Sequence, residues 1–155
     1  MATFSGNQGG TFTPVAHATN ANNITLDADT AGDIGMVKQI MWGGRGTTST
    51  GYRTRWGRAT TVGATPSAIT VGKSNAQATA LCSVNTYSTA PILAADPAAL
   101  FAIDWNLVGG GGVIVLPLGG EWLVANGAQP YQQIACGNIA GTDANLSSYG
   151  IVWLE

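Results

Sequence analysis

Short segments with a two-residue period recur along the chain, and they restrict it to β structure. In the clearest, residues 51–61, Tyr52, Thr54 and Trp56 occupy one face of an extended strand. Similar segments follow at spacings of roughly 8–12 residues and are bounded by Gly, Pro and Asn. We expect strands at 23–27, 36–42, 51–61, 68–71, 78–87, 91–94, 101–108, 113–118, 121–125, 132–139 and 149–154.

Helix signals are almost absent, because good helix formers are scarce and Thr, Gly, Asn and Val dominate. One short helix is expected over 96–101, where Asp96 can cap and Pro97 can occupy the first helical position. Many short strands with turn signals between them are typical of a sandwich or barrel. We therefore predict one all-β domain over residues 24–155 with the form of an antiparallel β-sandwich or barrel; the resemblance described below narrows this to a jelly-roll or related antiparallel β-sandwich.

Residues 1–23 have a different composition, rich in Gly, Asn and Thr, with Phe4, Phe12 and Val15 as sparse apolar positions. We expect them to form an extended N-terminal arm outside the core. They contain no basic region followed by an apolar run, so no signal peptide is expected. No stretch of the chain approaches the roughly 20 apolar residues that a membrane-spanning helix needs, and we expect no membrane insertion.

The chain carries few charges. Six Lys or Arg and eight Asp or Glu make up 9% of its residues, against roughly 25% in an ordinary soluble domain. Charge keeps a free protein solvated and apart from its neighbours. We therefore expect other protein to cover much of this surface, copies of the same chain first of all. The net charge of −2 argues against a broad nucleic-acid-binding face.

The basic residues are unevenly placed, since four of the six are Arg45, Arg53, Arg55 and Arg58. The last three follow one predicted strand with few acidic residues nearby, so they should repel one another unless something acidic meets them. A solvated strand face, a docking face for carboxylates of a partner or neighbouring copy, and contact with a polyanion all fit this pattern. We take the four arginines as the predicted partner-binding residues.

Three motifs that often carry chemistry are incomplete here. His17 is the single histidine and has no nucleophile signature beside it. The stretch 27–33 resembles the start of a calcium loop, but Ala31 occupies a ligand position and Lys38 stands where a closing Glu is needed. We expect a turn with local side-chain bonds there. The glycines 109–112 lack the Lys-Ser/Thr pair of a phosphate loop and predict a flexible hairpin connection.

The carboxylates do not suggest an enzyme, because they are spread over separate segments, whereas a glycosidase needs two that face each other. They are Asp96, Asp104, Glu121, Asp143 and Glu155. We expect no catalytic activity, no cofactor and no metal site.

Two residue types leave alternatives open. The five tryptophans can serve as core, as a subunit interface or as a platform that stacks on sugars; they are Trp42, Trp56, Trp105, Trp122 and Trp153. Cys82 and Cys136 have no spacing motif, so free buried thiols are the first expectation and a disulfide is the second.

Several segments together resemble a group of tailed-phage virion proteins. They are a Tyr-Arg-x-Arg-Trp strand at 52–56, a Gly/Thr/Pro turn region at 60–66, an Ala/Thr-rich strand at 76–84, a Pro-containing connection at 87–91, a Gly-Glu-x-Leu-Val strand at 120–124 and the closing Trp-Leu-Glu at 153–155. The resemblance covers about two thirds of the chain and excludes the arm and the four-glycine turn.

This resemblance implies a jelly-roll capsid decoration or cement protein, often a trimer, made in the host cytoplasm and bound on the capsid surface of the virion. The partners it implies are other copies of the chain and the major capsid protein or other virion proteins, without nucleic acid or membrane. The main alternative is a receptor- or carbohydrate-binding module of the fibre or adhesin type. A β-sandwich hydrolase is the alternative from another class.

Overall fold

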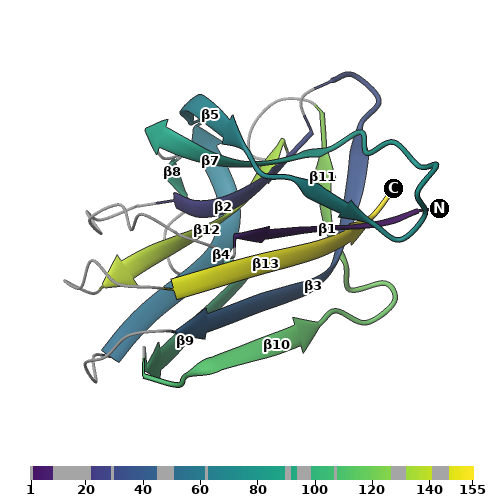
Figure 1. The fold of residues 1–155 in the computed structure, drawn as a ribbon. Helices are drawn as coiled ribbons and strands as arrows, with labels where there is room; N and C mark the ends of the chain where they lie inside the picture. Colours follow the sequence, from purple (N-terminus) through teal and green to yellow (C-terminus); the bar gives the residue numbers. More distant parts are fainter. Residues whose placement is uncertain are drawn as a thin grey trace.

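The computed structural model describes residues 2–8, 22–28, 30–44, 51–61, 63–89, 92–93, 99–106, 108–126, 132–140 and 147–155. Within these ranges the chain contains strands, turns and no helix. The strands form two antiparallel sheets that pack against each other (Figure 1). The predicted all-β sandwich is therefore confirmed.

Sheet A is built around the long central strand β3 (Ile34–Gly44), with the C-terminal strand β13 (Ser147–Leu154) beside it. Its spatial order is β10 (Gly111–Val115), β3, β13, β1 (Thr3–Gln8) and β6 (Val71–Lys73). The strand β11 (Trp122–Ala125) pairs with β3 on the same side as β10, further along its length.

Sheet B has β2 (Asn22–Asp27), β12 (Gln133–Ala140) and β4 (Gly51–Thr61) at its centre. Its spatial order is β5 (Ala64–Ala68), β7 (Ser83–Thr89), β2, β12, β4 and β8 (Ile92–Leu93), and β9 (Phe101–Asn106) also pairs with β4. Consecutive strands β1 to β4 alternate between the two sheets, and so do β12 and β13. The chain thus returns repeatedly across the core (Figure 1).

The core lies between the sheets and is filled from alternate positions of the strands, as the two-residue period predicts. Phe4 stacks on Trp153 with ring centroids 5.7 Å apart, and Trp42 lies against Phe101 at 5.9 Å. Burial of each large side chain of this kind contributes about 1.5–3 kcal/mol. Fully buried members from both sheets include Ile24, Leu26, Val37, Ile40, Trp56, Ile134, Ile151 and Trp153.

The prediction of an N-terminal arm over residues 1–23 is wrong for its first part. Thr3–Gln8 form β1, which pairs with β13 on one side and with β6 on the other. Phe4 is only 1% exposed, and a Cβ on Gly6 would lie 2.8 Å from Val84, so the strand packs tightly on sheet B. The strand is buried through only one aromatic residue and a glycine. The sparse apolar composition of residues 1–23 therefore gave no sign that this strand belongs to the core. Residues 9–21 lie outside the described ranges.

Two smaller expectations also change. The helix expected over 96–101 is wrong at its end, since Ala99 and Leu100 are not helical and Phe101 begins β9; residues 94–98 lie outside the described ranges. The strand expected over 68–71 is divided, because Ile69 and Thr70 separate β5 from β6.

The two ends of the described chain meet. Ala2 and Glu155 exchange backbone hydrogen bonds of 2.9 and 3.1 Å, and the chain ends lie close together in Figure 1. The Glu155 carboxylate accepts hydrogen bonds from the backbone N–H groups of Leu81 and Cys82 and from the Trp153 indole N–H. One side chain thereby fixes the loop before β7 to the end of sheet A.

Candidate functional site

Of the arginines predicted to bind a partner, the three that the structure describes, Arg53, Arg55 and Arg58, do not share one surface. Arg53 lies opposite Asp104 of β9, and its Nη1 is 3.2 Å from the Asp104 carboxylate in an ion pair that is largely exposed. Arg55 is only 8% exposed. Arg58 donates from Nη1 to the backbone carbonyl of Leu123 in β11, 2.8 Å away. Arg45 lies outside the described residues.

The parity of the strand explains this separation. Arg53 and Arg55 project from the face of β4 opposite Trp56, whereas Arg58 shares the parity of Trp56 and connects sheet B to sheet A. The carboxylate that pairs with Arg53 is that of Asp104, which is distant in the sequence but adjacent in the sheet. The fold therefore employs Arg53 and Arg58 in internal contacts; both side chains keep part of their surface exposed, whereas Arg55 is buried.

A buried polar cluster lies on the side of sheet B that faces away from sheet A. Asp27 has no exposed surface, and its Oδ2 accepts hydrogen bonds from Asn85 Nδ2 at 2.6 Å and Tyr87 Oη at 2.8 Å. Gln133 Nε2 donates to the same Tyr87 hydroxyl at 2.9 Å. These residues come from β2, β7 and β12, so sequence spacing alone could not have brought them together.

The calcium-loop resemblance does not produce a site. Asp27 is engaged in the buried cluster, while Asp33 Oδ2 accepts from the backbone N–H of Thr30 at 2.9 Å and Gly32 adopts a φ of 96°. This is the turn with local side-chain bonds that the sequence predicted. Asp29 lies outside the described ranges.

Lys38 and Glu121 form an ion pair with 2.5 Å between Nζ and Oε1, and both side chains are mostly buried. The hydrogen bond from Lys38 holds the pKa of the Glu121 carboxyl below its ordinary value of 4.5; the backbone N–H groups of Glu121 and Gly119 act in the same direction, and burial opposes them. Glu121 Oε2 accepts from Gly119, whose φ of 81° permits a tight turn closed by Gly120 N–H to Pro117 O.

The described residues contain neither a metal-binding cluster nor a membrane-spanning helix. In the described part of the chain, no group of three or more His, Cys, Asp or Glu side chains is placed to hold a metal ion. Nor do the described residues include a helix that is long and apolar enough to cross a membrane. Cys82 and Cys136 are both free and buried, which confirms the first expectation for them.

The tryptophans serve mainly as core. Trp42, Trp56 and Trp153 are buried, and Trp105 is partly buried with its indole N–H donating to Thr54 Oγ1 at 2.9 Å. Trp122 is partly buried against the same core. Among these five, no ring stands exposed as a sugar-stacking platform would.

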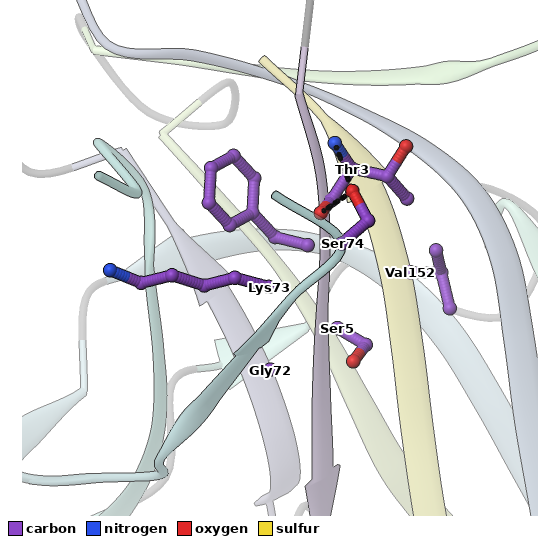
Figure 2. Close-up of a pocket in the computed structure, with 7 residues that line it drawn as sticks. Thr3, Ser5, Gly72, Lys73, Ser74 and Val152 are labelled. Atoms are coloured by element: carbon purple, nitrogen blue, oxygen red, sulfur yellow. Dashed lines mark hydrogen bonds between the residues drawn. The ribbon is translucent and has the colours of Figure 1, made fainter. Parts of the chain in front are cut away.

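A shallow hollow lies where β6 crosses the edge of β1 (Figure 2). Its volume is roughly 370 Å³, and its lining is mostly backbone and small hydroxyl side chains: Thr3, Phe4, Ser5, Gly72, Lys73, Ser74 and Val152. Ser74 Oγ donates to the carbonyl of Thr3 at 2.8 Å and accepts from its N–H at 3.3 Å. The hydroxyl is thus engaged in holding β6 against β1.

The outward face of sheet A is the most distinctive surface in the described residues. Most of its large side chains are apolar, with Gln39 and Asn7 as polar members, and several are half exposed or more: Ile34 is 53% exposed, Val113 57%, Val115 68% and Leu123 50%. Register places them in rows with further outward residues of β3 and β13. We call the following set the sheet A outer face: Ile34, Met36, Met41, Val113, Val115, Leu123, Val152 and Leu154.

Sequence reasoning missed this surface because each of its residues belongs to a segment that also supplies the core. Comparison of the chain with protein-family models, with curated proteins and with solved structures found no match.

Proposed function

We propose that this chain is a structural virion protein, a capsid decoration or cement protein that stabilises a phage head through subunit–subunit contacts. The observation that carries the proposal is the exposed aliphatic sheet A outer face on a chain whose charged residues, where the structure describes them, mostly bond within the chain. Lys38, Arg53 and Arg58 each contact a group within the same chain. Exposed apolar patches of this kind mark interaction surfaces.

The strand order supports the jelly-roll form of this proposal. If β5 to β8 are left out and β10 with β11 counts as one strand, eight strands remain. Numbered along the chain, sheet A then has the order 1-8-3-6 and sheet B the order 2-7-4-5. This is how a jelly roll winds, and viral capsid proteins use that fold. The strands β5 to β8 are an insertion between the fourth and fifth strands of this scheme.

Fold alone does not assign function, so the phage context depends on the resemblance of residues 52–56 and 120–124 to tailed-phage virion proteins. That resemblance directs the proposal to a homo-oligomer, a trimer in proteins of this kind, on the outside of the capsid. The proposed partner is the major capsid protein. No catalytic step, cofactor or metal enters the proposal.

The test is the position of the chain in the particle encoded by the same genome. Mass spectrometry of purified particles should detect the chain, and a cryo-electron microscopy map should place it on or between capsomers. Removal of its gene should give heads that lose DNA at a lower temperature. Absence from the particle, or a position at the tail tip together with binding on a glycan array, would overturn the proposal.

A further inference from the structure

We infer that the sheet A outer face is the surface through which two copies of this chain pack, sheet against sheet. The inference rests on the proposed assembly role and specifies its first contact. Its starting point is the register of the outward residues. Val113 lies beside Met41, Val115 and Val152 lie on either side of Gln39, and Leu123 and Leu154 lie on either side of Met36. Ile34 and Ala125 form a further row.

Close packing around two glycines lowers the relief of this side of sheet A, which the hollow beside β6 interrupts. A Cβ on Gly150 would lie 2.4 Å from Asn7 Oδ1 and 2.6 Å from Met41 Cε, so neighbouring side chains close over the glycine. A Cβ on Gly72 would lie 2.7 Å from Ser5 Oγ at the other edge. Small residues alternate with aliphatic ones, and the result is a low relief that a second sheet can approach to the ~10 Å spacing of packed sheets.

Charge argues against a strongly acidic or basic occupant and fits a second copy of the chain. The strands of sheet A contain two charged residues, Lys38 and Lys73. Lys38 is neutralised by Glu121. Figure 2 shows the Lys73 side chain leaving β6 on the side away from Ser5 and Val152. A face without net charge meets its own copy about a two-fold axis with no like-charge contact, whereas an acidic or basic partner would require the opposite sign here.

The outward side of the whole of sheet A is close to the size that a stable pair needs. Strands about eight residues long at ~3.3 Å per residue, placed side by side at ~4.8 Å across the five strand positions of sheet A, give a footprint of roughly 600 Å². The sheet A outer face covers three of these positions, and β1 and β6 supply the other two. Side chains standing on the whole footprint expose more area than the flat projection, so its burial approaches the ~800 Å² per partner of a standard interface.

The turn between β10 and β11 extends the same edge. Leu118 is 91% exposed at its corner, and the turn is held by the hydrogen bonds of Gly119 N–H to Glu121 and of Gly120 N–H to Pro117. An aliphatic side chain on a fixed turn loses little conformational freedom when a partner covers it. Leu118 is thus placed to contact the edge of the second copy.

The experiment measures the oligomeric state of the full chain by sedimentation over a wide concentration range. The expected species is a dimer, or a larger even-numbered assembly such as two of the proposed trimers joined through this face. Val115→Lys places two ammonium groups in each interface and should raise the dimer Kd at least about 100-fold. Leu81→Lys is the matched control, because Leu81 is 57% exposed in the loop before β7 and lies outside the face; it should leave Kd within about twofold.

Val113→Thr is a second, milder variant for the case in which Val115→Lys does not fold, because threonine keeps the β-branched shape of valine. It should raise the dimer Kd by about 10-fold and leave the circular dichroism spectrum unchanged. A wild type that stays monomeric at high concentration overturns the inference. So does a trimer or other oligomer that Val115→Lys leaves intact. If such a protein still binds capsids, the proposed function stands and only the self-pairing face is wrong; if neither association nor capsid binding occurs, both fail.

Discussion

Asp27 is the acidic residue that the described structure leaves with no exposed surface, and its carboxyl group accepts hydrogen bonds from Asn85 and Tyr87. A buried acceptor with two donors is costly to remove because both donors lose their partner in a place that water does not reach. Asp27→Ala is expected to lower the free energy of unfolding by about 3 kcal/mol, measured by chemical denaturation.

Asp104→Ala provides the comparison for Asp27→Ala, since it removes an aspartate from another strand of sheet B whose side chain is 72% exposed. An exposed ion pair contributes little, and we expect a loss of at most about 0.5 kcal/mol. Equal losses for the two variants would contradict the structural role assigned to the buried cluster.

Glu121 gives the fold a specific pH dependence. The hydrogen bond from Lys38 lowers the pKa of Glu121 below 4.5 in the folded chain. A carboxyl whose pKa is lower in the folded than in the unfolded state stabilises the fold at pH above its unfolded value. That contribution disappears as the pH falls through the folded value. The destabilisation caused by Glu121→Gln should therefore be largest near neutral pH and should shrink in acid below pH 4.5.

Denaturant titrations of wild type and Glu121→Gln at several pH values measure this difference. The same pair in a Lys38→Met background is the control, because the first cause of the lowered pKa is then missing and the pH dependence should weaken. A Glu121→Gln effect that stays constant from neutral pH into acid would contradict the assignment.

At the scale of the element, β1 decides whether the first residues of the chain belong to the sandwich. Phe4 is buried against Trp153 and is the one large apolar side chain of its strand. Phe4→Ala is expected to cost about 3–5 kcal/mol in unfolding free energy, as truncation of a buried Phe does. Ser5→Ala, on the outward side of the same strand, should change it by less than about 0.5 kcal/mol. If Phe4→Ala left the unfolding free energy unchanged, residues 3–8 would be better described as an arm outside the core.

The glycines 109–112 illustrate two different requirements within one element. Gly109 adopts a φ of 69° in the turn that leads into β10, whereas Gly112 lies inside β10, where a Cβ would meet the Trp42 ring at 2.5 Å. Gly112→Ala should displace Trp42 and cost about 1–3 kcal/mol, with a shift in tryptophan fluorescence emission. An unshifted spectrum with full stability would show that the ring has room.

Much of the fold could be predicted from the sequence because a strand's two-residue period is a local property. The strand expected at 51–61 has the bounds of β4, and those expected at 23–27 and 149–154 differ from β2 and β13 by at most two residues. The arm prediction failed because β1 is buried through backbone pairing and Phe4. The prediction of a single arginine surface was wrong because Asp104 reaches Arg53 across a strand pairing and Leu123 reaches Arg58 from the opposite sheet. Such pairings are not visible in local patterns.

At the scale of the whole molecule, the outward sides of the two sheets differ in a way that accords with the scarcity of charge. Sheet B has a polar side that is buried, with Thr25, Asp27 and Gln133 all without exposed surface. Sheet A has an aliphatic side that is open. The usual arrangement of a soluble sandwich places polar residues outward on both sheets. The asymmetry concentrates the capacity for association on one face of the molecule.

Changing the salt concentration shows whether that association is driven by apolar burial or by electrostatic attraction. Pairing through the sheet A outer face buries aliphatic groups and no net charge, so its Kd should change by less than about threefold between 50 and 500 mM NaCl. Sulfate at the same ionic strength should tighten it, since excluded salts strengthen apolar burial. Docking through Arg53 onto carboxylates of a second copy predicts the opposite, a Kd that rises steeply with NaCl, because exposed charges are screened within about 10 Å at 0.1 M salt. Sedimentation in the three buffers, repeated with Arg53→Gln, distinguishes the two. If the copies associate through the sheet A outer face, Arg53→Gln leaves the Kd unchanged. A steep salt dependence of Kd that disappears in Arg53→Gln would assign the contact to the arginine instead.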